Sequence, residues 1–422
     1  MTRADDKVRT SSMLSRDSGA ARLSLALSIL VCELGYSSLA AAAAAEGPAV
    51  IDIGPVAVTP TTGLESRFSD NIYLQENNPT SSWIYLVRPA VTAQMQDRSN
   101  LYRLSYDGEA AWYQEDSAND RNDYYDQTFS GDVYILPAER WIATAYASYA
   151  LLHEDRGTGL TEGEIGNVIP KPVEYDQSDV GGTIEYGSGV GRINFNAHYM
   201  DREYTNFKQF TRTRDVEEIR LGTTFFYPIA PRTDILLDYS HSDFNYPNAF
   251  ENLPALDSTE NTIQAGVEWE ITPNMTSRAQ AGGTQKKFED SERDEWSGLT
   301  WTLSLLMQPT ELDTVTITGQ KAPEETSLQG DFINRESLTT TWDHSWSDRV
   351  DTSLSGTVAR ERYEQSIDDR DDYIYNVTAR ANYAFRRWVN TYVSYSYDNK
   401  DSNADNLSYE QNAFMIGVDL SL

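Results

Sequence analysis

Hydrophobic and polar residues alternate along most of the chain beyond residue 50. Between residues 375 and 383, tyrosine, valine and alanine occupy the odd positions, whereas Asn376, Thr378 and Arg380 occupy even ones. A period of two places successive side chains on opposite faces of a β-strand. Similar segments of about 10 to 14 residues recur without helical spacing, so the pattern predicts an all-β chain.

Two kinds of break separate these segments, and they alternate along the chain. One kind is tight and carries proline or glycine, as in LPAER (136–140) and YPIAPR (227–232). The other is longer, polar and acidic, as in QEDSANDRND (114–123), EDSERDE (289–295) and DNKDSNADN (398–406). Successive tight turns lie about 40 residues apart, so the repeating unit is a pair of strands.

This asymmetry predicts a transmembrane antiparallel up-and-down β-barrel with short periplasmic turns and long acidic outer loops. A soluble β-sandwich has no physical reason to make one end of its sheets tight and the other long, whereas an outer-membrane barrel does. Nine long loops and eight tight turns predict about 18 strands over residues 58–422. Every backbone polar group in a bilayer needs an internal partner, so the last strand is expected to pair with the first.

The final segment, AFMIGVDLSL, places alternate apolar residues on one face. These residues are Phe414, Ile416, Val418, Leu420 and Leu422. We expect them to face lipid, because the opposite face of the segment is small or polar. A C-terminal strand of this kind resembles the signal that the barrel assembly machinery reads, although that signal usually ends in phenylalanine.

The first 45 residues differ from the rest of the chain. After Arg22 an apolar run, LSLALSILVC, is followed by an alanine-rich stretch, which predicts a secretory signal peptide cut near Ala45. Residues 46–57 then form a periplasmic N-terminal segment. Cleavage removes Cys32, the chain's one cysteine, so the exported protein is expected to contain no disulfide.

Composition narrows the possible functions. The formal net charge of −31 argues against binding of nucleic acid, because cations are too few to neutralise phosphates. The chain has 26 tyrosines and 9 tryptophans against 13 phenylalanines, and such amphipathic rings suit a membrane–water interface. We therefore expect outer-membrane lipid and lipopolysaccharide as partners.

The segment GPVAVTPTTGLESRFSDNIYL (54–74) resembles the start of the putative beta-barrel porin 2 family, through Gly63, Asp70, Asn71 and Ile72. The likeness continues through residues 82–91 and 100–113 and covers residues 50–422. The resemblance implies a barrel in the outer membrane of a Gram-negative bacterium. It also implies a link with the export of exopolysaccharide or capsule, as in many relatives.

The polar half of each alternation is expected to face the lumen. The pore-lining candidates are Arg88, Arg103, Asp107, Glu109, Arg192, Arg220, Asp238, Glu268, Glu270, Arg278, Asp343 and Arg380. Their signs are mixed, and we expect the charge of the wall to be nearly balanced, with the excess acid in the outer loops. Such a wall suits a hydrated solute such as a sugar chain, or it is an ordinary polar surface with cross-strand ion pairs.

Two features of the loops leave alternatives open. The longest loop, residues 153–174, contains several glycines and two prolines. It either folds inward and narrows the pore or lies on the outer surface. The acidic loops either bridge to lipopolysaccharide through divalent cations or simply carry solvated charge.

Signals for an enzyme are weak. The four histidines, His153, His198, His241 and His344, show no spacing typical of metal ligands. We therefore predict no catalytic residues, no metal site and no cofactor.

Three functions remain on these grounds. The first is a channel that assists export of an exopolysaccharide or capsule, with periplasmic polysaccharide-export proteins as partners and the polysaccharide in the lumen. The alternative is a diffusion or substrate-selective uptake porin with a small solute in the lumen. An outer-membrane hydrolase or a structural surface protein comes third.

Overall fold

The computed structural model describes residues 50–114, 122–163, 169–248, 255–326, 330–366 and 368–421. The predicted signal peptide, residues 46–49 of the predicted periplasmic segment and Leu422 lie outside these ranges.

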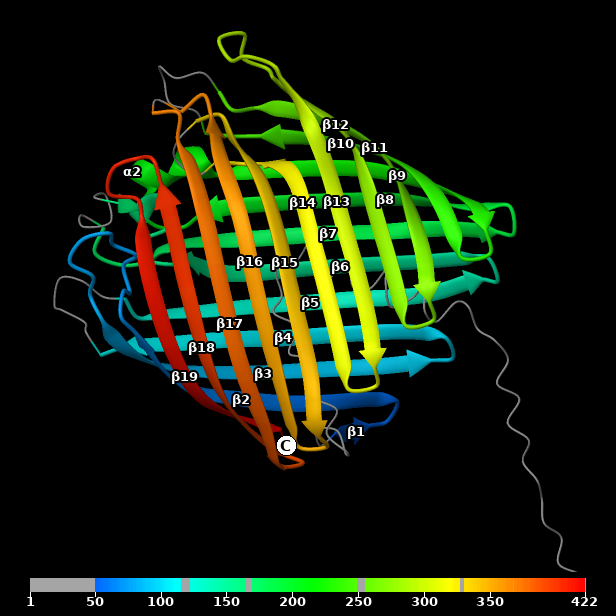
Figure 1. Ribbon diagram of the computed structural model, residues 1–422, viewed down its shortest axis with the longest axis horizontal. Helices are drawn as coiled ribbons and strands as arrows, with labels where there is room; N and C mark the ends of the chain where they lie inside the picture. Colours follow the sequence, from blue (N-terminus) through cyan, green and yellow to red (C-terminus); the bar gives the residue numbers. More distant parts are fainter. Residues whose placement is uncertain are drawn as a thin grey trace, which may run out of the picture. The chain divides into compact units, whose positions relative to one another are not determined.

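Eighteen antiparallel strands follow one another around a ring (Figure 1). They are β2 (Val56–Ser69), β3 (Ser82–Asp97), β4 (Asn100–Tyr113), β5 (Tyr124–Ala138), β6 (Trp141–Glu154), β7 (Val173–Ser188), β8 (Gly191–Tyr204), β9 (Val216–Ala230), β10 (Thr233–Asn245), β11 (Ser258–Thr272), β12 (Met275–Phe288), β13 (Trp296–Thr310), β14 (Asp313–Glu324), β15 (Phe332–Ser347), β16 (Val350–Glu364), β17 (Asp371–Arg386), β18 (Val389–Ser402) and β19 (Tyr409–Ser421). Each strand pairs with its neighbour in sequence, as the pattern of turns predicts.

The ring closes between its last and first strands. β19 pairs antiparallel with β2, from Ala413 opposite Ser69 to Ser421 opposite Thr61. A short strand, β1 (Ile51–Ile53), pairs with the start of β2, beyond the part that β19 covers. Closure leaves no strand of the ring with an unpaired edge, and the predicted closed barrel of about 18 strands is confirmed.

The two ends of the barrel differ as predicted. At one end, here called the turn end, eight connections of two residues each join the strands, such as 139–140 and 231–232. At the other, the loop end, nine connections span between 6 and 18 residues. They include the short helices η1 (Gly159–Thr161), α2 (Lys208–Thr211) and η3 (Arg212–Arg214). None of the helices in the described part of the chain is long and apolar enough to cross a membrane.

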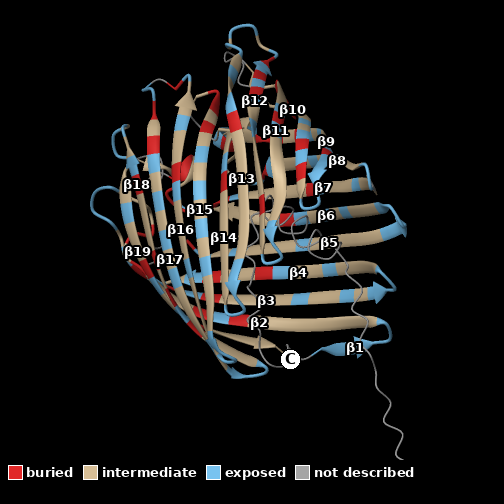
Figure 2. Ribbon diagram, turned by 45° about the vertical axis from the view of Figure 1, so that its right-hand side comes forward, coloured by how far each residue is buried: buried red, intermediate tan, exposed pale blue. Residues whose placement is uncertain are grey.

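Alternation gives the barrel an apolar outer face and a polar inner face. Phe195, Ile263 and Val377 are among the large apolar side chains exposed on the outside. The residues next to them in sequence point to the inside, where Gln264, for example, is buried and hydrogen-bonded to Thr300. Intermediate and exposed residues predominate along the strands (Figure 2). This is the pattern of a sheet with lipid on one side and polar groups on the other.

The final strand follows the same rule. Phe414 and Ile416 are exposed on the outer face, and Val418 lies opposite the exposed Leu64 of β2. Leu420 lies opposite Thr62 on the same face. The recognition of this strand by the assembly machinery stays a prediction.

A candidate channel interior and its entrance

All twelve predicted pore-lining residues lie on the inner face. Their Cα partners on neighbouring strands show this, because residues directly opposite one another in a ladder share a face. Arg88 lies opposite Gly63, and Glu268 lies opposite Asp234 and Arg278. Whether these side chains line a conducting pore stays a prediction.

One network brings three of the predicted residues together across the seam of the ring. Arg88 donates to Glu109 Oε2 at 2.6 Å and to Glu65 Oε2 at 3.0 Å. The hydroxyl of Tyr392 also donates to Glu65 Oε2, at 2.6 Å. The guanidinium of Arg380 lies 3.6 Å from the centre of the Tyr392 ring. The network thereby links β2–β4 with β17–β18.

Glu65 is the centre of this network, and the sequence interpretation missed it. Arg67 also donates to it, at 2.9 Å. Both residues occupy alternate positions of the first strand, so the alternation that selected the other candidates could have found them. Gly417 lies opposite Tyr392, and the Tyr392 ring fills the space that a Cβ at Gly417 would need. A side chain at position 417 would therefore displace the ring from Glu65.

A second network lies at the turn end and brings three more predicted residues together. Arg192 forms an ion pair with Glu268 and lies 3.5 Å from Glu185 Oε2. Its guanidinium also lies 3.7 Å from the centre of the Phe226 ring, and that of Arg278 lies 5.3 Å from the same ring.

The other six predicted residues are distributed along the inner wall. Arg103 pairs with Asp132 at 3.8 Å, and Arg220 pairs with Glu218 at 2.9 Å. Asp238 accepts a hydrogen bond from Thr224 at 2.5 Å. Glu270 follows Glu268 on the inner face of β11, and Asp107 and Asp343 lie on the inner faces of β4 and β15. The predicted charges are therefore scattered along the wall.

The inner wall carries an excess of carboxylates, and the expectation of near balance is wrong. The inward carboxylates are those of Glu65, Asp107, Glu109, Asp126, Asp132, Glu154, Asp179, Glu185, Glu218, Asp234, Asp238, Glu260, Glu268, Glu270, Glu324, Asp343, Asp351, Glu361, Asp372, Asp398 and Asp419. The inward cations are Arg67, Arg88, Arg103, Arg192, Arg202, Arg220, Arg278, Lys286, Arg335, Arg380 and Lys400. The sequence pattern assigned Glu154 and Asp398 to loops, whereas the strands extend to include them.

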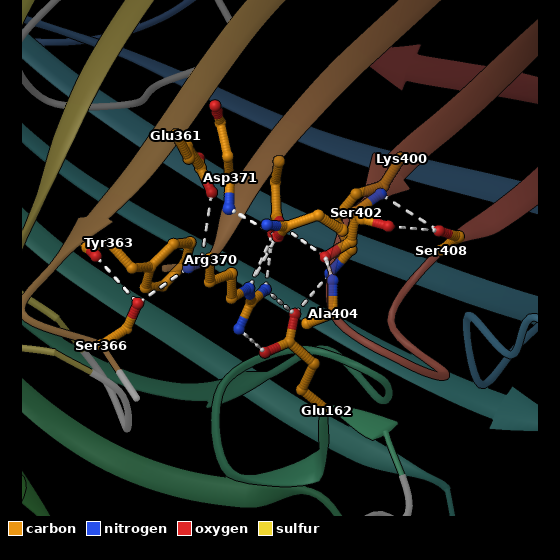
Figure 3. Close-up of polar contacts among 12 residues, drawn as sticks. Glu162, Glu361, Tyr363, Ser366, Arg370, Asp371, Lys400, Ser402, Ala404 and Ser408 are labelled. Carbon is orange, nitrogen blue, oxygen red and sulfur yellow. Dashed lines mark hydrogen bonds and ion pairs between the residues drawn. The ribbon is translucent and has the colours of Figure 1, made fainter. Parts of the chain in front are cut away.

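The described part of the loop between β6 and β7, residues 155–163 and 169–172, places Glu162 beside residues of β17 and β18 (Figure 3). Glu162 accepts hydrogen bonds from Arg370 Nη2 at 2.6 Å and Nη1 at 2.8 Å, and Lys400 also donates to it. Arg370 donates in addition to Asp372, at 2.6 Å. Lys400 and Asp372 are inner-face residues of β18 and β17, so Glu162 lies inside the ring of strands. We call Glu162, Arg370, Asp372 and Lys400 the latch.

The latch lies far from the base of its loop. Five strands, β5, β4, β3, β2 and β19, separate β6 from β18 along the shorter way around the ring. A loop that begins on β6 and contacts Lys400 on β18 must therefore cross part of the opening. For the described residues of the loop, these contacts support the inward fold and not a position on the outer surface.

In the latch, burial and neighbouring charges shift the pKa values of Glu162 and Arg370 in opposite directions. Burial raises the pKa of Glu162, but the hydrogen bonds and charges of Arg370 and Lys400 outweigh it and hold that pKa below its ordinary value. Burial likewise lowers the pKa of Arg370, and the two carboxylates beside it raise that pKa above its usual range. Glu162 and Arg370 are therefore both charged at neutral pH, and each lies beside a partner of opposite charge.

Further contacts hold the base of the same loop. Glu154 accepts a hydrogen bond from the Tyr204 hydroxyl at 2.7 Å and forms an ion pair with Arg214. Arg156 donates to the Ile169 carbonyl at 2.6 Å, and its guanidinium lies 5.2 Å from the centre of the Tyr73 ring. The loop is thus tied to loops 70–81 and 205–215 as well as to the latch.

A second loop, 325–331, is held at the same end. Lys286 on β12 is fully buried, lies 4.2 Å from the centre of the Phe244 ring and pairs with Glu325. Arg293 pairs with Asp331. The entrance is therefore built from cations of one element that bind carboxylates of another.

Two of the solved structures that resemble this chain come from Pseudomonas. OccK9 (OpdG) of Pseudomonas aeruginosa is 10% identical, with 86% of this chain and 98% of that chain covered and a TM-score of 0.48. A BenF-like porin from Pseudomonas fluorescens Pf-5 is 9% identical, with 86% and 99% covered and a TM-score of 0.46.

A comparison with curated proteins finds no match. The profile of the family described as Putative beta-barrel porin 2 matches residues 45–422, which is the whole barrel and the segment before it. The chain therefore belongs to the Putative beta-barrel porin 2 family and is a porin-like β-barrel channel of the outer membrane.

Proposed function

We propose that this barrel is a substrate-selective diffusion channel, in the outer membrane of a Gram-negative bacterium, that admits small hydrated solutes. The observation that carries the proposal is the loop latched across the entrance. A polymer in export needs a continuous wide path, whereas a small solute can pass beside a fixed loop. The proposal therefore favours uptake over the polysaccharide export that the family resemblance suggested.

The energetics of the latch support a permanent constriction. Arg370 and Asp372 are almost completely buried, so withdrawal of Glu162 would leave Arg370 with one of its two carboxylate partners. Separating buried charges from their partners costs several kcal/mol, about 3 to 5 by mutational measure. A loop held this firmly stays in place while solutes pass.

The inner wall supports the same function. Its side chains are mostly hydrogen-bonded to one another, as in the network around Glu65 and that around Arg192. A wall of oriented donors and acceptors replaces part of the hydration of a polar solute without requiring the wall to rearrange.

Conductance and solute uptake test the proposal. Purified protein in planar bilayers should form open channels, and liposomes that contain it should swell in small sugars and amino acids but not in oligosaccharides. A closed barrel, or equal passage of long oligosaccharides, would contradict the proposal. Loss of surface polysaccharide in a deletion strain whose uptake of small solutes is normal would favour export instead.

A further inference from the structure

We propose that the lumen selects cationic solutes over anionic ones. The inference rests on the proposed function and deepens it, because it names the charge class of the solute. It follows from how the charges of the inner wall are paired.

The inward cations are largely neutralised by carboxylates. Arg88 lies between Glu65 and Glu109, and Arg335 lies between Glu324 and Glu361. The inward cations within ion-pair distance of a carboxylate are Arg67, Arg88, Arg103, Arg192, Arg220, Lys286, Arg335, Arg380 and Lys400. A paired cation offers little net attraction to an anion in the lumen.

Several inward carboxylates are not neutralised in this way. Within the described ranges, no lysine or arginine lies within ion-pair distance of Asp107, Asp343, Asp351 or Asp398. Asp351 accepts a hydrogen bond from the amide of Asn382 at 2.7 Å, and Asp398 accepts one from Asn376 at 2.5 Å. These neutral donors orient the carboxylates without cancelling their charge.

The uncompensated carboxylates lie on one side of the ring, on the arc that runs from β15 through β19 and β2 to β4. Asp107 lies on β4, Asp343 on β15, Asp351 on β16 and Asp398 on β18. Their side chains share the inner face with the mixed networks, so each contributes to the potential of the lumen. A passage with low-dielectric walls focuses such a field and enriches counter-ions within it. A cation therefore meets attraction along the wall, whereas an anion meets repulsion.

Carboxylates on the outer face allow the effect of inward charge on selectivity to be separated from the effect of the chain's overall acidity. Asp243, Glu336 and Asp401 are exposed on the outer face of β10, β15 and β18. Glu336 and Asp401 share β15 and β18 with inward carboxylates, and Asp243 lies on β10. All three carry the same charge as the inward carboxylates but do not face the lumen. They provide a matched control for any loss of inward charge.

The test is the reversal potential across a bilayer with a KCl gradient. The wild-type channel should pass K⁺ in preference to Cl⁻. The triple variant Asp107→Asn, Asp343→Asn, Asp398→Asn should lower the permeability ratio about two- to threefold, as expected for removal of partly screened charges. The triple variant Asp243→Asn, Glu336→Gln, Asp401→Asn should leave the ratio unchanged.

Each outcome separates this inference from the function on which it rests. An anion-selective or unselective wild-type channel, or an inner variant with an unchanged ratio, would overturn charge selection while the diffusion channel stands. Absence of any conductance would contradict the proposed function itself. If the triple variant fails to assemble, Asp343→Asn alone should shift the ratio in the same direction by a smaller factor.

Discussion

An ion pair at the loop end of the barrel and one nearer the turn end differ in how far they are buried. At the loop end, the side chains of Arg370 and Asp372 are 1% and 0% exposed. Among the inward pairs nearer the turn end, the side chains of Arg103 and Asp132 are 38% and 40% exposed and lie 3.8 Å apart. Two-residue turns cannot fold over the opening, whereas an 18-residue loop can. The 18-residue loop thus covers the buried pair at the loop end, whereas buried charge at the turn end, such as Asp234 beside Arg192, lies among strand residues.

This difference in burial determines how strongly the loss of an ion pair affects stability. A solvated pair gains little, because water screens it and its side chains lose entropy. A buried pair is also weak evidence for stability, but loss of one partner is costly since it leaves an uncompensated charge. The latch should therefore respond strongly to mutation and the open wall weakly.

The largest effect is expected for Arg370→Ala. The change leaves Asp372 and Glu162 buried without their shared cation and should destabilise the barrel by about 3 to 5 kcal/mol. Arg103→Ala should cost about 1 kcal/mol or less. Denaturant unfolding of both variants in lipid vesicles measures the comparison, and equal costs would show that burial does not set the contribution of these pairs.

Glu162→Gln should have a smaller effect, and a local one. The amide keeps the size of the side chain but loses two charge-assisted interactions, each about 1.5 to 3 kcal/mol. Because only the loop depends on them, single-channel conductance and its noise should rise while global stability changes little. Glu174→Gln, at the exposed base of the same loop, serves as control. Unchanged conductance in Glu162→Gln would mean that the latch does not hold the constriction.

Arg192→Met tests an intermediate case at the turn end. Arg192 is 13% exposed and contacts Glu268, Glu185 and Asp234. Its loss leaves three carboxylates near one another but within reach of water, so a cost of about 1 to 2 kcal/mol is expected. Conductance noise should stay at the wild-type level, since the described ion-pair partners of this cation all lie in strands. Increased conductance noise in Arg192→Met would show that ion pairs at the turn end also control the constriction.

The smallest effect is the pH dependence of the latch. The pKa of Glu162 is lowered from its ordinary value of 4.5, so its contribution is complete above pH 4.5 and is lost as the pH falls through the lowered pKa. Conductance should therefore stay constant from pH 7 to 4.5 and rise only in more acidic solution. Glu162→Gln should lack this rise. A transition above pH 4.5 would contradict the assignment.

Much of the fold could be predicted from local patterns. Proline and glycine marked the tight turns, and period-two alternation marked the strands, so the number of strands and the inner face of each followed. The twelve inward candidates were found in the same way. The side-chain networks could not be predicted from the sequence. Arg88 and Tyr392 come into contact only when the ring closes, and no local feature distinguishes Glu65 from any other inward carboxylate.

The sequence by itself determined which side chains face lipid and which face the interior, because alternation along a strand depends only on neighbouring residues. The tertiary structure alone decided that Glu162 meets Arg370, 208 positions away, inside the mouth of the barrel. Such a contact depends on the closed ring, the length of the loop and the position of the opposite wall. These are properties of the whole chain, and no segment read alone contains them.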